Sequence, residues 1–236
     1  MAPISIVDSH VHLWPSTAAN AAGHGWMSEG DMLAKQHILS DYLHAAHQDP
    51  DDTSSVHVQG VVYLETDRRL EEFTGQPLLE WARQPTEEIE FLRSIVERQY
   101  GENDSKLLLA LVPWAPLNRG REVFREWLEH VQMTAGPTTW RRIKGFRFLL
   151  QAITDQAEFK NLVYSSDFIS ILKSFRGHGR NFSFDVGIDQ HSGGVWQLET
   201  FANVIGKVHS GVDEEEKVIF ILSEWPMFRV CAELRR

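Results

Sequence analysis

Cysteine is almost absent from the sequence, since Cys231 is the only one among 236 residues. A single thiol excludes an internal disulfide and is typical of a reducing compartment, so we expect a cytoplasmic protein. The start of the chain has no basic segment followed by an apolar one, and we expect no secretory signal. The longest apolar run, residues 107–117, contains two prolines and is too short to cross a bilayer, so no membrane partner is expected.

The sequence has no excess of basic residues either. Asp and Glu number 33 against 23 Lys and Arg, which gives a formal net charge of −10. The basic residues are scattered along the chain, so nucleic acid is not an expected partner. No G-x-G-x-x-G string follows an apolar segment, which argues against dinucleotide binding. The 42% of hydrophobic residues suffices for a sizeable core, and we expect one domain over residues 1–236.

Apolar segments typical of strands alternate along the chain with segments of helical periodicity. The strand-like segments are residues 4–10, 60–65, 106–114, 143–150, 182–188 and 217–222. Their nearly continuous apolar character is typical of parallel strands that are covered by other layers. Strands and helices in series predict a parallel α/β fold, and both a barrel and an open doubly wound sheet fit this pattern.

The helical segments carry apolar stripes that are predicted to face the core. Two of these stripes are Ile89, Leu92, Ile95 and Val96, and Val195, Leu198, Ala202 and Ile205. Thr86 is predicted to cap a helix that starts at Glu87, because its hydroxyl suits the N-cap position and acidic residues follow it.

Residues 15–57 are poor in strand signals and are predicted to form a long insertion with one helix over residues 40–47. Loops that follow the carboxyl end of a strand often form part of an active-site wall. For the polar stretch 48–55, a disordered surface excursion fits equally well.

The string Val-Asp-Ser-His-Val-His-Leu-Trp at residues 7–14 is the most informative part of the chain. Alternate side chains of a strand share a face, so Asp8, His10 and His12 are predicted to point the same way. Two imidazoles at this spacing can bind one divalent ion, which makes His10 and His12 candidate metal ligands. The alternative to metal binding is that two of the eleven histidines alternate here by chance.

Catalytic groups of α/β barrels lie where strands end and loops begin. The later strand ends offer Glu65, Trp114, Arg147, Gln151, Asp185 and Glu224. Acids, imidazoles and an arginine that converge would suit metal-assisted or carboxylate-assisted hydrolysis.

Two of these candidates have alternative interpretations. Glu65 precedes Arg68 and Arg69, so a local ion-pair cluster explains it as well as a catalytic role does. Arg147 lies inside an apolar strand, where an unpaired cation would be costly to bury. It is therefore either a member of an internal salt bridge or an anchor for an anion or a carbonyl group.

Several strings together resemble a known family. Residues 7–14 resemble the first-strand signature of the amidohydrolase-related (amidohydrolase 2) metal-dependent hydrolases. The string Lys-Gly-Phe-Arg-Phe-Leu-Leu-Gln at 144–151 is similar to the fourth-strand segment of its sugar-lactonase branch. That branch includes L-rhamnono- and L-fucono-lactonases and pyrone-dicarboxylate lactonases. Residues 184–188 are similar to the strand that follows, and the resemblance extends from about residue 4 to residue 221.

The resemblance implies an α/β fold of the (β/α)₈ TIM-barrel type, here incomplete with about six recognisable strands. The family's histidine at the end of the sixth strand has no counterpart. Instead, the string Ser-Glu-Trp-Pro at 223–226 resembles the eighth-strand motif, with Glu224 in place of an aspartate. A full barrel needs about 250 residues, so we expect that a stretch with the seventh strand and parts of its neighbours is absent, joined across residues 222–223.

The resemblance also implies an activity, the opening of a lactone ring. His10 and His12 would hold a divalent metal, Zn²⁺ or Mn²⁺, unless the reaction is metal-independent. Glu224 and Asp8 are the expected catalytic residues, with Glu224 as the base and Asp8 as a ligand or an orienting group.

The expected substrate-binding residues, taken from the strand ends, are Arg147, Gln151, Trp114 and Glu65. The expected partner is a small-molecule substrate, and a homo-oligomer is an open option. Two alternative functions are a metal-dependent decarboxylase of the same fold and a truncated, non-catalytic relative.

Overall fold

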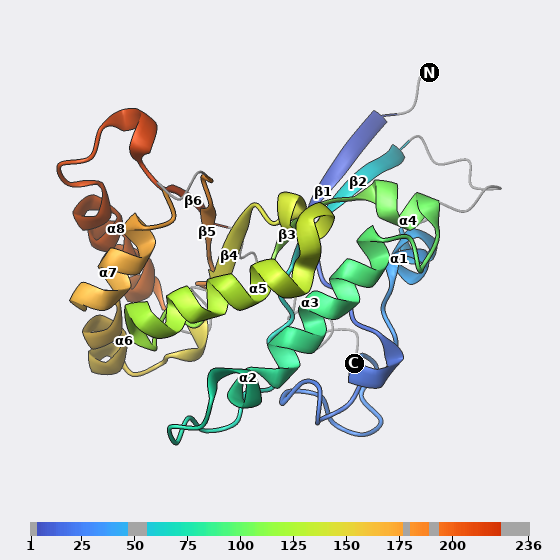
Figure 1. Ribbon diagram of the computed structural model, residues 1–236, viewed down its shortest axis with the longest axis horizontal. Helices are drawn as coiled ribbons and strands as arrows, with labels where there is room; N and C mark the ends of the chain where they lie inside the picture. The colour runs from blue at the N-terminus through green and yellow to red at the C-terminus, as the bar shows by residue number, and fades with distance from the viewer. Residues whose placement is uncertain (1–3, 47–55, 177–179, 189–193, 223–236) are drawn as a thin grey trace. The chain divides into compact units, whose positions relative to one another are not determined.

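The computed structural model describes residues 4–46, 56–176, 180–188 and 194–222 (Figure 1). The chain divides into two compact units. The first unit contains Met1–Trp114 and Glu126–Lys144, and the second contains Ala115–Arg125 and Gly145–Arg236. Each unit has helices and a three-stranded sheet, and all strand pairs of these sheets are parallel. The α/β prediction with parallel strands is confirmed at this level.

The sheet of the first unit has the order β1 (Ile4–Val11), β2 (Val56–Leu64), β3 (Leu108–Val112). All three predicted strands are present, although β2 begins earlier than predicted. Residues 106 and 107 belong instead to helix α4 (Glu102–Leu107), directly before β3. The carboxyl ends of the three parallel strands lie at one edge of this sheet, where the loops that follow them begin.

Helices α1 (Leu39–Ala45), α2 (Leu78–Trp81) and α3 (Arg83–Val96), with the short 3₁₀ turn η1 (Ser16–Ala18), complete the amino-terminal part of this unit. The helix predicted in the insertion is confirmed as α1. The stripe predicted on α3 is buried as expected. The predicted cap at Thr86 is wrong, because α3 begins at Arg83 and the Thr86 hydroxyl donates within the helix to the carbonyl of Ala82, 3.0 Å away.

Helix α5 (Gly120–Arg142) contains a break near its end. Gly136 has a φ of 66°, a conformation that favours glycine, and Pro137 follows it. The proline cannot donate a helical hydrogen bond, and its fixed φ suits the start of a new helical turn. The last turns of α5 therefore run in a new direction towards residue 143.

The sheet of the second unit has the order β4 (Gly145–Phe148), β5 (Ser183–Val186), β6 (Ile219–Leu222). The three predicted strands are confirmed, each shorter than predicted. Helices α6 (Gln156–Val163), α7 (Ser166–Lys173) and α8 (Val195–His209) lie beside this sheet (Figure 1). The 3₁₀ turns η2 (Leu150–Ala152) and η3 (Glu214–Glu216) follow β4 and precede β6.

A cluster of phenylalanines forms the core of the second unit. Phe184 of β5 contacts Phe168 of α7 and Phe201 of α8, with ring centroids 6.3 and 6.0 Å apart. Phe201 also contacts Phe220 of β6 at 5.8 Å. The large buried area of such rings fixes how the helices pack against the sheet.

The stripe predicted for α8 is wrong. Val195 and Ala202 are exposed, and the buried face is instead Gln197, Thr200, Phe201, Val204 and Val208. Both stripes have helical spacing, but only the second contains Phe201, whose burial removes the larger apolar area from water. The Gln197 amide is accommodated because its Nε2 donates to the carbonyl of Ile153 at 2.8 Å.

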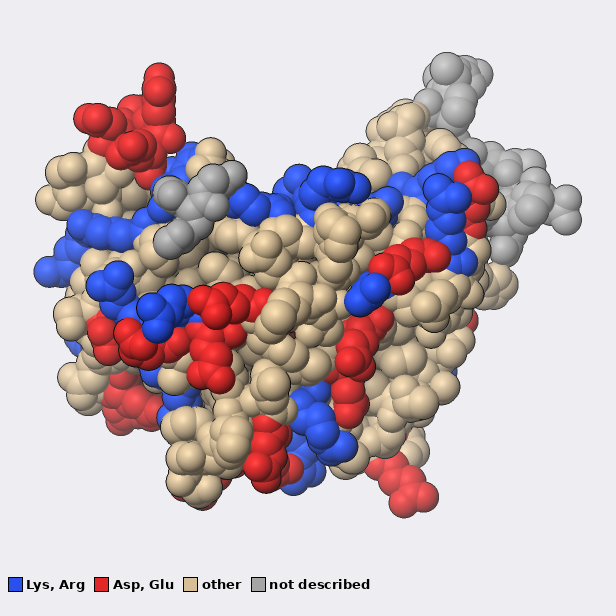
Figure 2. Space-filling view, viewed as in Figure 1, with Lys and Arg blue, Asp and Glu red and all other residues tan. Residues whose placement is uncertain are grey.

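Charged side chains of both signs are interspersed with neutral ones on the face seen in Figure 2. Within the described ranges, no helix has the length and apolar character needed to cross a membrane.

Candidate functional site

The carboxyl end of β1 brings two imidazoles together. His10 is in β1 and His12 follows the last strand residue, so the two-residue period of a strand places both rings on one side. Their Nε2 atoms are 3.0 Å apart, and the ring planes meet at 81°. The pairing of β1 with β2 is irregular between Asp8 and Val11. Such irregularities re-aim side chains at strand ends.

The orientation of the His12 ring is fixed by β2. Its Nδ1 is 3.1 Å from the carbonyl oxygen of Leu64, the last residue of β2. A carbonyl can only accept, so this contact assigns the proton of His12 to Nδ1. The lone pair of Nε2 then faces His10, which is the tautomer that a metal ligand requires.

Asp8 is held at both carboxylate oxygens. Its Oδ1 accepts the backbone N–H of His10 at 3.0 Å, and its Oδ2 accepts the hydroxyl of Tyr42 at 2.9 Å. Burial, together with the hydrogen bond to Asp8 and its negative charge, raises the pKa of Tyr42. The hydroxyl therefore stays protonated and remains a donor. Sequence reasoning did not find Tyr42, because no local pattern links residues on β1 and α1.

Glu65 follows β2 directly and is buried. Its backbone N–H donates to the carbonyl of Val112 at 3.0 Å, and its carboxylate accepts the backbone N–H of Asp67. Asp67 has a φ of 53°, so the chain turns sharply here. Glu65 is thus fixed at the edge where β2 and β3 end.

Trp114 lies just beyond β3 in the core of the first unit. Its ring packs between those of Trp81 and Trp127, at centroid distances of 5.6 and 5.2 Å. Its carbonyl accepts the indole N–H of Trp127 at 3.1 Å. These contacts account for its burial as core packing.

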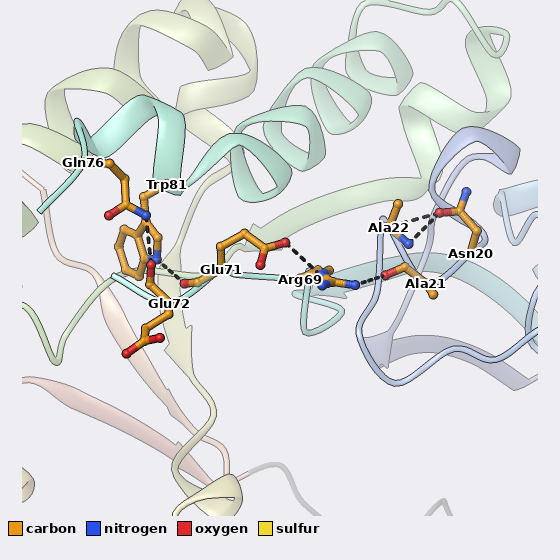
Figure 3. A network of polar contacts seen from close by, with 9 residues as sticks. Asn20, Ala21, Ala22, Arg69, Glu71, Glu72, Gln76 and Trp81 are labelled. Atoms are coloured by element: carbon orange, nitrogen blue, oxygen red, sulfur yellow. Dashed lines mark hydrogen bonds and ion pairs between the residues drawn. The ribbon is translucent and has the colours of Figure 1, made fainter. Parts of the chain in front are cut away.

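The loop after β1 is joined to the loop after β2 by polar contacts that centre on Arg69 (Figure 3). Arg69 Nη1 donates to the carbonyl of Ala21 at 3.1 Å, and its Nε pairs with Glu71 at 3.0 Å. The carbonyl of Glu71 accepts the indole N–H of Trp81 at 2.8 Å. Arg69 therefore pairs with Glu71, a residue outside the ion-pair cluster predicted around Glu65. The described part of the insertion is packed against the β2 loop.

A buried histidine forms a second link between these loops. His24 Nδ1 donates to the carbonyl of Ala18, and its Nε2 accepts the hydroxyl of Thr66, both at 2.8 Å. Burial, assisted by the positive charge of Arg68, lowers the pKa of His24 to about 4. His24 is therefore neutral at pH 7, with both ring nitrogens satisfied.

Arg147 is paired in the second unit. It lies opposite Asp185 in the β4–β5 register, with Arg147 Nε 3.4 Å from Asp185 Oδ1 and 3% of each side chain exposed. The internal salt bridge, one of the two interpretations open for Arg147, is therefore present. Gly187 leaves room for the guanidinium, since a Cβ there would lie 3.1 Å from Arg147 Nε.

Gln151 is held beside this pair by its backbone N–H, which donates to the carbonyl of Gly187 at 2.8 Å. Its Oε1 is buried and has no hydrogen-bond partner among the described residues. A buried acceptor of this kind suits a ligand that carries a hydroxyl or N–H donor.

The predicted site residues that the structure describes are thus divided between the two units. His10, His12, Asp8, Glu65 and Trp114 are in the first unit, whereas Arg147 and Gln151 are in the second. Glu224 lies outside the described residues. Over the described ranges, no three His, Cys, Asp or Glu side chains gather as a metal cluster. One common site for all these groups stays a prediction.

The sequence matches no protein-family model. It is 29% identical over 215 residues to L-rhamnono-gamma-lactonase of Scheffersomyces stipitis, and the match covers 88% of this chain and 58% of that protein. The expected similarity to a lactonase is confirmed by this match.

Two crystal structures of an amidohydrolase from Burkholderia multivorans share the fold of this chain. The form with bound zinc has a TM-score of 0.54 at 20% identity and matches 86% of this chain and 54% of its own. The form with bound HEPES has a TM-score of 0.52 at 19% identity, with 86% and 53% covered. The chain spans less than two thirds of the length of each of these relatives.

Proposed function

We propose that this chain is a hydrolase that opens the ring of a sugar lactone or a related small cyclic ester. The observation that carries the proposal is the His10–His12 pair, with Nε2 atoms 3.0 Å apart at the carboxyl end of β1. The similarity to a protein named L-rhamnono-gamma-lactonase supports the proposed reaction. The six parallel strands belong, in this proposal, to one (β/α)₈ barrel domain whose strand ends share a mouth.

The two imidazoles fit a divalent metal. Zinc–nitrogen bonds are about 2.0–2.1 Å long, so two ring nitrogens 3.0 Å apart can both reach one ion. The bond from His12 Nδ1 to Leu64 supplies the supporting contact that metal-bound imidazoles usually have. A bound Zn²⁺ or Mn²⁺ would supply a water of lowered pKa or polarise the lactone carbonyl.

The remaining residues bind and orient the substrate. In this proposal Arg147, besides its pair with Asp185, also holds the carbonyl oxygen or a substrate carboxylate through its planar fork, and the buried Oε1 of Gln151 accepts a substrate hydroxyl. Glu224 takes the proton of the attacking water as general base. Glu65 and Trp114 form part of the wall around the ring, and Asp8 orients His10 through its backbone N–H.

The test is hydrolysis of a panel of aldonolactones by the purified full chain, with metal content measured on the same sample. We expect acid release that a chelator abolishes and that Zn²⁺ or Mn²⁺ restores. His10→Ala should reduce kcat/KM by at least about 100-fold, whereas the control His57→Ala, at an exposed histidine of β2, should not.

Two outcomes would count against the proposal at different points. If no lactone is opened by the metal-loaded chain, the lactonase activity is wrong. If hydrolysis survives both the chelator and His10→Ala, the metal role is wrong and a carboxylate-assisted reaction replaces it.

A further inference from the structure

The helix of the insertion places a hydroxyl against Asp8, two residues before His10. Tyr42 lies in α1, 34 residues after Asp8, and its hydroxyl donates to Asp8 Oδ2 at 2.9 Å. The start of α1 is fixed close to the end of β1, because Trp14 and His37 exchange two backbone hydrogen bonds of 2.8 and 3.0 Å. The segment that follows His12 therefore also sets the position of Tyr42.

Two hydrogen bonds connect Tyr42 through Asp8 to the backbone of His10. Asp8 Oδ2 is occupied by the Tyr42 hydroxyl, while Asp8 Oδ1 accepts the backbone N–H of His10. The His10 ring in turn lies 3.0 Å from His12 through the two Nε2 atoms. A carboxylate with one anchored oxygen has a restricted rotation, so it presents the other oxygen to the His10 amide in one orientation.

We propose that Tyr42 is a positioning residue of the imidazole pair, whose hydroxyl locks the Asp8 carboxylate so that it fixes the backbone of His10 beside His12. The inference rests on the proposed function, because it takes His10 and His12 as the metal-binding pair. It also assigns Asp8 an orienting role, since both of its oxygens are engaged by donors of the chain.

The variant Tyr42→Phe removes only the hydroxyl. We expect it to weaken the binding of Co²⁺ to the full chain by about 10-fold to 100-fold, the usual cost of losing a supporting contact at a metal site. The matched control is Tyr100→Phe, the same deletion in the same unit at a ring that packs on Phe91. The control should bind Co²⁺ as the unsubstituted chain does.

A second measurement needs no metal. The backbone amide proton of His10 and the imidazole nitrogens of His10 and His12 are observed by NMR in the metal-free chain. Tyr42→Phe should move the His10 amide signal upfield and change the tautomer populations, whereas Tyr100→Phe should leave both unchanged. Identical Co²⁺ affinity and identical His10 signals in Tyr42→Phe would overturn the inference.

A double-mutant cycle separates this link from a general effect on folding. In the Asp8→Ala background, Tyr42→Phe should cost no further Co²⁺ affinity, because the acceptor oxygens through which Tyr42 acts are already gone. Fully additive losses would contradict the proposal. If Tyr42→Phe does not fold, Asp8→Ala tests the step from Asp8 to His10, and an unchanged His10 amide signal in that variant would overturn the inference.

The failure of the proposed function is distinguishable from the failure of this inference. If the unsubstituted chain binds no Co²⁺ at His10 and His12, the metal site is wrong. The NMR comparison still decides whether Tyr42 fixes His10.

Discussion

At the scale of single residues, His24 shows how burial changes a common side chain. Its neutral ring is satisfied by Ala18 and Thr66, and its pKa is lowered from 6.5 to about 4. The unfolded chain therefore binds a proton at a higher pH than the folded chain does. The contribution of His24 to stability is constant above pH 6.5 and falls as the pH decreases from 6.5 towards 4.

We predict that the contribution of His24 to the free energy of unfolding falls by up to about 1.4 kcal/mol per pH unit as the pH decreases from 6.5 towards 4. It is measured as the difference in unfolding free energy between the unsubstituted chain and His24→Gln, whose amide does not titrate. The difference should shrink between pH 6.5 and pH 4.5. A pH-independent difference for His24→Gln would contradict the assigned protonation state.

Arg147 and Asp185 form the second residue-scale case. Their side chains are almost fully buried, and each limits the cost of burying the other's charge. Asp185→Asn leaves the guanidinium with a neutral neighbour. We expect a loss of about 3–5 kcal/mol of unfolding free energy, measured by chemical denaturation.

The control for this prediction is Asp167→Asn, because Asp167 lies in the first turn of α7 and is not part of the Arg147–Asp185 pair. It should change stability much less. If Asp185→Asn proves as mild as Asp167→Asn, the buried pair has little role in the stability of the sheet.

At the scale of elements, the close approach of β4 and β5 depends on a glycine. A Cβ on Gly145 would lie 2.3 Å from the carbonyl oxygen of Ser183, which is backbone and cannot give way cheaply. The two strands pair in register at this point. No side chain fits here without separating them.

Gly145→Ala is therefore expected to lower the free energy of unfolding by about 1–3 kcal/mol, as overpacking does. Gly206→Ala is the matched control, because a Cβ there meets nothing within 4 Å and Gly206 lies inside α8. It should raise stability by about 0.5–1 kcal/mol. Both are measured by denaturant unfolding, and equal effects of one sign would contradict the packing argument.

At the scale of the whole molecule, two sheet edges carry exposed apolar side chains. On β1, Ile4 is 63% and Val7 is 50% exposed, and on β6 Ile219 is 55% and Leu222 is 62% exposed. Near-continuous apolar runs predicted covered strands, and this holds for β4 and β5 but is wrong for the first half of β1 and for β6. Such edges favour association with other chains.

We therefore predict concentration-dependent self-association of the chain, measured by sedimentation velocity. Replacing Ile4 and Val7 with lysine should reduce it, because charged side chains on an edge oppose strand pairing. Lysine at exposed Met133 of α5 is the control. A chain that stays monomeric at high concentration, or association unchanged by the β1 lysines, would contradict this role of the edge.

Local patterns in the sequence determined the alternation of strands and helices and the pairing of His10 with His12. These features depend on residues close in the chain, where a period of 2 or 3.6 fixes which side chains share a face. The resemblance of residues 7–14 and 144–151 to a known family predicted the similarity to a lactonase, because these two strings are specific to that family.

Only the tertiary structure decided which distant residues meet. Tyr42 reaches Asp8 across 34 positions, and His24 reaches Thr66 across 42. Arg147 faces Asp185 because the register of β4 and β5 aligns them. On α8, two stripes have helical spacing, and contact with Phe184 selects the one that includes Phe201. Periodicity gives each element its faces, whereas the packing between elements determines which face is buried and which polar groups find partners.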